Sequence, residues 1–182
     1  MSGLSASRKG ITPMRVADVI FKRLEQYTDT VYFVPGGGAM FLVDALGRSG
    51  LRHVSMIHEQ GAGIAAIGHA MVGGLGVCLT TSGPGATNAV TACLSAWTDS
   101  VPVLFISGQA RTEQINASTA RAKGLQYADI VGMVSPITKR AHEPQDADSC
   151  LTTLDDMIHE CMTGRHGPCW LSVPQDVQGV EV

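Results

Sequence analysis

Apolar runs of strand length alternate with stretches of helical periodicity along the chain of 182 residues. The apolar runs predict strands and lie at 31–34, 52–57, 75–80, 102–107 and 168–173. The stretches with apolar residues on one helical face lie at 13–24, 39–50, 59–72, 86–99 and 145–163. This alternation predicts strands separated by helices. Residues 111–128 lose any periodicity and are expected to form an exposed loop or an irregular helix, and 137–141 add a further short segment.

The expected fold is an α/β three-layer open sandwich. Strands that are apolar throughout and separated by helices imply a mostly parallel sheet, here of about six strands, with helices on both faces. The length suffices for one sizeable core, so residues 11–179 are expected to form a single domain behind a flexible tail, residues 1–10. Thr12 and Pro13 are typical of an N-cap and a first-turn proline at the start of the first helix.

Composition and charge argue against several kinds of partner. A formal net charge of −3 gives no electrostatic footprint for nucleic acid. No apolar run approaches the ~20 residues of a membrane span, and the first ten residues lack the apolar stretch of a signal peptide. The five cysteines form no CxxC pair, which favours buried thiols in a reducing compartment. These features predict a cytoplasmic protein.

Small and polar residues follow the predicted strands, where a parallel sheet gathers its ligand-binding loops. Such loops lie at 35–38, 58–61, 82–88 and 107–109, and they should meet at the carboxyl edge of the sheet. Glycine-rich turns here could cradle a phosphate. However, they match neither GxGxxG nor GxxxxGK[ST] and carry no lysine, so the support for a nucleotide site is weak.

Between Ile11 and Gly179 the chain resembles a known family, the thiamine diphosphate enzymes. The likeness is to the pyrimidine-binding domain of acetolactate synthase-like members. The motifs that carry it are long and occur in order: "VPGGGAM", "HEQGAGIAAIGHA", "TSGPGATNAVTACLSAWTDSVPVLFISGQ", "DIVGMVSPITKRA" and "GPCWLSVPQDVQG". The resemblance implies that the chain binds the pyrimidine half of thiamine diphosphate.

The resemblance gives Glu59 a specific role. In this family the matching glutamate hydrogen-bonds N1′ of the aminopyrimidine, which helps the cofactor to lose the proton of its thiazolium C2. A glutamate in the first turn of a helix also has a simpler explanation, since it favours the helix dipole. Gly36, Gly37 and Gly38 match the loop that comes close to the reaction centre, with ordinary turn geometry as the alternative.

Further site residues follow from matching positions. Ser82, Gly83, Pro84 and Asn88 are similar to the turn that packs beside the pyrimidine ring, where glycine allows close approach of the backbone. Gln109 is similar to the glutamine that reaches toward substrate or cofactor in acetolactate synthases. His58, although adjacent to Glu59, is expected to support the loop, because neighbouring side chains point in different directions.

The family also uses a second domain, marked by a GDG sequence, that binds the diphosphate through Mg²⁺, and no GDG occurs in this chain. The resemblance therefore implies that the diphosphate-binding and central domains are absent here, that Mg²⁺ lies on a missing domain or partner, and that FAD is possible in a full-length enzyme. No metal site is expected in this chain. We expect a homodimer, a diphosphate-binding partner and a 2-oxo acid substrate, with pyruvate the leading candidate. A subunit of a split 2-oxo acid decarboxylase of the sulfopyruvate type, or a noncatalytic assembly or regulatory domain, remains an alternative.

Overall fold

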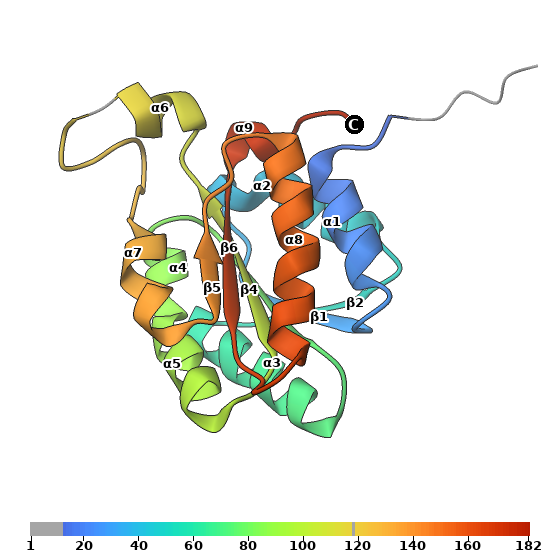
Figure 1. The fold of residues 1–182 in the computed structure, drawn as a ribbon. Coiled ribbons are helices and arrows are strands. Elements are labelled where there is room, and N and C mark those ends of the chain that lie inside the picture. Colours follow the sequence, from blue (N-terminus) through green and yellow to red (C-terminus); the bar gives the residue numbers. More distant parts are fainter. Residues whose placement is uncertain (1–12, 118) are drawn as a thin grey trace, which may run out of the picture.

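The computed structural model describes residues 13–117 and 119–182 (Figure 1). Its centre is a six-stranded sheet in the order β2-β1-β3-β4-β6-β5, and every neighbouring pair is parallel. The strands are β1 Thr30–Phe33, β2 Arg52–Ser55, β3 Gly76–Thr80, β4 Val103–Gln109, β5 Arg140–His142 and β6 Cys169–Pro174. The predicted α/β sandwich with a parallel sheet of about six strands is confirmed.

Helices cover both faces of the sheet. One face carries α1 Val16–Leu24, α2 Met40–Arg48, α8 Ala147–Met162 and α9 Gln175–Gln178. The other face carries α3 Glu59–Val72, α4 Pro84–Asn88, α5 Val90–Asp99 and α7 Ile130–Val134. The remaining helical segments are η1 Gly37–Ala39, α6 Thr112–Ala117 and η2 Ser135–Ile137.

The two cores arise from the period of 2 along the central strands. In β4, Leu104 and Ile106 pack in the core under α1, α2 and α8. Val103 and Phe105 pack in the core under α3 and α5, where Phe105 stacks on Trp170 with ring centroids 5.0 Å apart. Both faces of β4 are thus buried, as expected for a strand that is apolar throughout.

Strand β2 departs from the prediction. Residues 52–57 were expected to form a strand that is apolar throughout, whereas β2 ends at Ser55 and all four of its residues are exposed. The reason is its position, because β2 lies at the edge of the sheet and pairs only with β1. An edge strand with polar residues such as Arg52 and His53 resists pairing with other chains.

Two predicted helices have different bounds. The helix expected over 86–99 is two helices, α4 and α5, that meet at Ala89. The first helix begins at Val16, so Pro13 precedes it and the prediction of a first-turn proline is wrong. Its N-cap is Arg15, whose backbone N–H donates to the Asp18 carboxylate over 2.9 Å. Thr12 and the expected tail lie outside the described residues.

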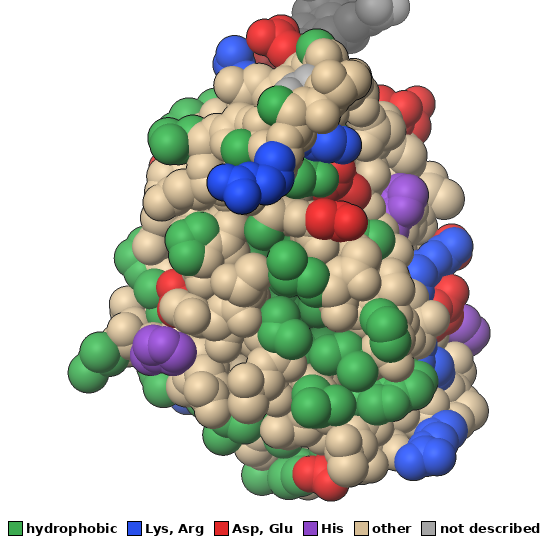
Figure 2. Space-filling model, turned by 90° about the vertical axis from the view of Figure 1, so that its left-hand side faces the viewer, with side chains coloured by type: hydrophobic (Ala, Val, Ile, Leu, Met, Phe, Trp, Pro, Cys, Tyr) green, Lys and Arg blue, Asp and Glu red, His purple; other side chains and the backbone are tan. Residues whose placement is uncertain are grey.

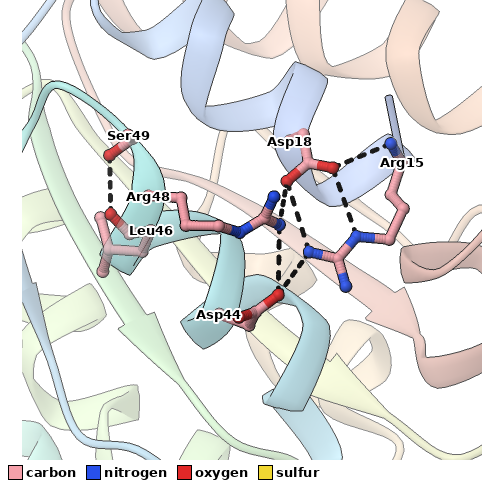
Figure 3. A network of polar contacts seen from close by, with 6 residues as sticks. All are labelled: Arg15, Asp18, Asp44, Leu46, Arg48 and Ser49. Atoms are coloured by element: carbon pink, nitrogen blue, oxygen red, sulfur yellow. Dashed lines mark hydrogen bonds and ion pairs between the residues drawn. The ribbon is translucent and has the colours of Figure 1, made fainter. Parts of the chain in front are cut away.

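A network of four charged side chains joins α1 to α2 (Figure 3). Asp18 accepts from Arg15 over 3.2 Å and from Arg48 over 2.5 Å, and Asp44 accepts from the same two arginines over 2.5 and 3.1 Å. Asp18 is the least exposed of the four side chains, so its pairs lose less strength to solvent than isolated surface pairs do. The network fixes the two helices beside each other.

Residues 111–128 agree with the expectation of an irregular segment, since only the short helix α6 forms within their described part. At the other end of the chain, Val182 donates its backbone N–H to the carbonyl of Met14 over 2.8 Å. Pairing therefore extends beyond Gly179, where the domain was expected to end. Among the described residues, the helices include none whose length and apolar content would allow it to cross a membrane.

Candidate functional site

The candidate site lies at the point where the strand order reverses. The chain adds β2 on one side of β1 and then β3 on the other, so the loops after β1 and β3 start side by side at the carboxyl edge and lead to helices on opposite faces of the sheet. These loops contact each other directly, because the Gly38 N–H donates to Oγ1 of Thr81 over 3.1 Å. Ligands of open α/β sheets bind at such switch points.

Glycine is required at two positions in this crossing of loops. A Cβ on Gly38 would lie 2.2 Å from Oγ of Ser82, and a Cβ on Gly108 would lie 2.1 Å from the carbonyl oxygen of Gly38. By contrast, a Cβ on Gly37 would meet nothing within 4 Å. Of the predicted glycines, Gly36 also approaches a neighbour closely, with Thr81 at 2.6 Å from its would-be Cβ. Gly37 has no such packing requirement.

Glu59 is the first residue of α3, directly after the loop that follows β2. The helix is capped by His58, whose Nδ1 accepts from the Gln60 N–H over 3.2 Å. His58 therefore supports the loop. Because α3 follows a parallel strand, its first turn lies at the carboxyl edge of the sheet, and Glu59 is partly buried there.

The Glu59 carboxylate rests against α4. Its Oε2 accepts a hydrogen bond from Nδ2 of Asn88 over 2.9 Å, and its Oε1 lies 3.2 Å from the position that a Cβ on Gly85 would occupy. Burial raises the pKa of the Cys78 thiol on β3, and the charge of Glu59 adds to that rise. The structure thus brings Glu59 together with the turn after β3. Within the described residues, Oε1 of Glu59 accepts no hydrogen bond.

The turn after β3 holds the other predicted contacts. Ser82 is buried, Gly83 has φ +55°, and Pro84 opens α4 at the surface. A side chain at Gly83 would be strained by this φ and would also lie 2.1 Å from the carbonyl oxygen of Gln126. Gln126 itself adopts φ 54°, so two residues in the left-handed region meet here. The segment around Gln126 is therefore built closely onto the turn.

Gln109 ends β4 at the same edge but is turned into the protein. Its side chain is 1% exposed. Nε2 donates to the carbonyl oxygen of Ala128 over 2.8 Å and to Oε2 of Glu143 over 2.9 Å, while Oε1 accepts from the Ala110 N–H over 3.0 Å. Gln109 is thus near the site, with both amide protons already bound within the chain.

A cavity of about 500 Å³ opens between these loops. Its lining comes from η1, from the turn after β3, from the end of β4 and from the irregular segment. The lining residues are Gly37, Gly38, Met40, Ser82, Gln109, Ala110, Arg111, Gln114, Leu125, Gln126 and Gln175. Four of the predicted residues, Gly37, Gly38, Ser82 and Gln109, therefore line one cavity, whereas Glu59 and Asn88 are not among its lining residues and pair with each other on α3 and α4.

Two glutamines of α9 also hold the loop of Gly36 to Gly38, called the glycine loop below, and the sequence analysis did not predict them. Gln175 donates to the Gly37 carbonyl over 3.2 Å. Gln178, fully buried, donates from Nε2 to the Gly38 carbonyl and to the Val173 carbonyl, both over 2.9 Å. Their place just after a strand, at the carboxyl edge, was the available signal. Among the described residues, no three His, Cys, Asp or Glu side chains gather in a way that could hold a metal ion.

The fold agrees with a comparison to protein families. Residues 14–133 match the family described as "Thiamine pyrophosphate enzyme, N-terminal TPP binding domain". This match covers most of the chain, and the chain belongs to this family of thiamine diphosphate-binding α/β domains.

The particular relatives are acetolactate synthases. The chain is 40% identical over 172 residues to the acetolactate synthase large subunit of Corynebacterium glutamicum, covering 93% of this chain and 27% of that protein. It is 38% identical over 180 residues to the acetolactate synthase isozyme 1 large subunit of Escherichia coli, covering 97% and 31%. An acetolactate synthase of Mycobacterium leprae is 40% identical over 164 residues, covering 88% and 25%. The chain thus spans between a quarter and a third of the length of these relatives.

Proposed function

We propose that this chain is the pyrimidine-binding module of a thiamine diphosphate-dependent enzyme of the acetolactate synthase type. The assembled enzyme would decarboxylate a 2-oxo acid, with pyruvate as the expected substrate, and transfer the activated aldehyde to an acceptor. The observation that carries the proposal is the position of Glu59, a partly buried carboxylate at the carboxyl edge that is held by Asn88. The family and the relatives support the same assignment.

The residues present fit the pyrimidine half of the cofactor. Oε2 of Glu59 is occupied by Asn88, so the hydrogen bond fixes the carboxylate while Oε1 keeps its acceptor capacity. A Cβ on Gly85 would lie 2.6 Å from Cγ2 of Thr81 and 3.2 Å from that oxygen, so glycine at this position lets α4 pack closely against Glu59. A carboxylate held in this way, with one oxygen left to accept, suits a heterocycle whose nitrogen shares a proton with it.

The chain's own residues would orient the ring and control one proton. Thiamine diphosphate, when bound, supplies the carbanion chemistry on which decarboxylation of a 2-oxo acid depends. Glu59 would hold, at Oε1, the proton that it shares with a nitrogen of the aminopyrimidine. Ser82, Gly83 and Pro84 would pack beside the ring, and the loop of Gly36 to Gly38 would close the site toward the substrate. An aspartate at position 59 would fall short by one methylene.

Exposed apolar side chains on the helices that include α3, the helix of Glu59, support the proposal that the chain binds a partner. Exposed large side chains come from α3, α5 and α7, the helices that cover this face of the sheet; we call Ile64, Met71, Leu94, Trp97 and Met133 the apolar face. Figure 2, which views the side of α5 and α7, shows hydrophobic side chains gathered there. Such patches mark interaction surfaces. We assign this face to contacts with the diphosphate-binding domain or subunit and to contacts within a dimer. The diphosphate-binding partner would carry Mg²⁺. FAD, where the full-length enzyme uses it, would also bind outside this chain.

A chimera tests the proposal. The chain replaces the matching N-terminal stretch of the C. glutamicum acetolactate synthase large subunit, and thiamine diphosphate binding and acetolactate formation from pyruvate are measured. We expect cofactor binding and turnover, and we expect Glu59→Gln to lower turnover by about 10²-fold or more, the range of a lost acid–base contribution. Glu59→Asp should lose most of the turnover as well.

Glu113→Gln is the matched control, since it removes one carboxylate from the exposed helix α6 at the same end of the molecule. A chimera that is folded but fails to bind the cofactor would favour the noncatalytic alternative. Full activity of Glu59→Gln would overturn the assigned role of Glu59.

A further inference from the structure

The carboxamide of Gln109 has one defined orientation in this structure. A primary amide carries two donor protons on nitrogen and acceptor capacity only on oxygen. Nε2 faces two acceptors, the Ala128 carbonyl and Glu143, and Oε1 faces a donor, the Ala110 N–H. Turning the amide over would place its oxygen against a carboxylate and a carbonyl. The three partners therefore select the same orientation.

Glu143 is the strongest of these partners. It follows β5 and reaches Gln109 from 34 positions away in the chain, over 2.9 Å. A hydrogen bond to an ionised carboxylate is about twice as strong as one between neutral groups. Because the other donor proton of Nε2 is bound by Ala128, the contact with Glu143 leaves Gln109 no proton for a ligand in the cavity that it lines.

The surroundings of Glu143 disfavour its charge. Burial raises the pKa of Glu143, and Asp129 at the start of α7 adds to the rise, whereas the hydrogen bond from Gln109 and the charge of Lys123 oppose it. Tyr127 also faces this carboxylate, whose charge contributes to the raised pKa of its phenol. On Glu143's own segment, His142 has a lowered pKa through burial and the nearby Arg140.

We propose that Glu143 is a proton-dependent positioning residue for Gln109. As a carboxylate it holds the Gln109 carboxamide inward and, through the shared contact with Ala128, fastens the segment 124–128 onto the turn at Gly83. When Glu143 is neutral, the hydrogen bond that it accepts from Gln109 loses the strength added by the charge, so a ligand in the adjacent cavity competes more readily for that Nε2 proton. The relevance of this hydrogen bond to catalysis rests on the proposed function, whereas the bond between Gln109 and Glu143 does not.

The test follows the side-chain amide of Gln109 by ¹H–¹⁵N NMR in the cofactor-free chain. The Nε2 protons of the wild type should shift in one step as pH falls, with a midpoint above the ordinary glutamate pKa of about 4.3. Glu143→Gln keeps an acceptor oxygen and should abolish the step. Glu113→Gln, a matched removal of an exposed carboxylate from the same end of the molecule, should leave the step unchanged.

A second measurement separates positioning from folding. In Glu143→Leu, amide hydrogen exchange within 124–128 should become faster, while exchange in β3 and β4 stays slow; Glu143→Gln should restore the wild-type rates. A Gln109 step that persists in Glu143→Gln, or a wild type without a step, overturns the proposal. Because neither readout requires thiamine diphosphate, loss of cofactor binding in the chimera would contradict the proposed function and leave this result intact.

Discussion

The side-chain amide of Asn88 donates a hydrogen bond to Oε2 of Glu59 over 2.9 Å and so joins the helices that follow two different strands. Glu59 opens α3 after β2, and Asn88 ends α4 after β3. Although β2 and β3 are separated in the sheet by β1, their loops meet above it. The contact selects which carboxylate oxygen of Glu59 faces the proposed pyrimidine.

Replacing Asn88 should therefore change the free energy of unfolding in a way that depends on the charge of the new side chain. Asn88→Ala removes one hydrogen bond to a charged group near the surface, so we expect the free energy of unfolding to fall by about 1 kcal/mol. Asn88→Asp places a second carboxylate against Glu59 and should be less stable than Asn88→Ala at pH 7. Because protonation of either carboxyl group removes the repulsion, this difference should be smaller at pH 4. Denaturant unfolding at both pH values measures it.

Asn116→Asp serves as the control, since Asn116 donates to Gln145 in an exposed pair without a carboxylate. It should show no comparable dependence on pH. Equal stabilities of Asn88→Asp and Asn88→Ala at pH 7 would mean that the contact with Glu59 is not maintained in solution.

A pair of glycine substitutions tests the crossing of loops at the switch point. In Gly108→Ala the new Cβ would lie 2.1 Å from the backbone oxygen of Gly38, so either β4 or the glycine loop must shift. We expect a loss of about 1–3 kcal/mol in the free energy of unfolding, the usual cost of overpacking. Gly37→Ala meets nothing within 4 Å and should change stability by no more than about 0.5 kcal/mol. Equal effects of the two changes in denaturant unfolding would contradict the described backbone approach.

Hydrophobic periodicity was sufficient to predict the fold because the central strands are buried on both sides. β3, β4 and β6 are buried throughout, and this gives the continuous apolar runs from which a parallel sheet can be predicted. The same signal was misleading for β2, whose position at the edge of the sheet depends on pairing that the local sequence does not encode. It also did not show the break at Ala89, since the residues on both sides are compatible with a helix.

The sequence was sufficient to predict those site residues whose positions are set by the ends of the parallel strands. Glu59, Ser82 and Gln109 each follow or end a strand, and parallel strands bring such positions to one edge. The partners of Gln109 were not predictable, because Glu143 lies 34 residues away and belongs to no motif. The inward direction of the Gln109 amide is therefore a result of tertiary packing alone.

The raised pKa of Glu143 predicts how its replacement changes stability with pH. Burial is the main cause of the rise, so the folded chain binds this proton more tightly than the unfolded chain does. The charged form therefore costs stability at pH 7, and this cost disappears as pH falls through the folded pKa. We expect Glu143→Gln to melt at a higher temperature than the wild type at pH 7, with the difference shrinking toward pH 4. A lower melting temperature at pH 7 would show that the contact with Gln109 outweighs burial.

The cysteines allow a final prediction, on access to the core. All five are free and buried, and burial raises the pKa of Cys78 and Cys93 and that of Cys150 to about 12. Disulfide exchange requires an accessible thiolate, so the native chain should not react rapidly with a disulfide reagent such as DTNB. Five thiols should react in denaturant. Ser55→Cys, on the exposed strand β2, supplies a positive control with one fast thiol.

The dependence of the thiol reaction rate on denaturant concentration distinguishes two ways in which the buried cysteines can become accessible. If the thiols become accessible only when the whole domain opens, all five should react with one rate that rises with denaturant in parallel with global unfolding. Cys78 lies on β3 near Glu59, so a single fast phase assigned to Cys78 would instead reveal local opening at the candidate site. Thiamine diphosphate in the assembled enzyme should then slow that phase alone, because a ligand stabilises only the openings that disrupt its site.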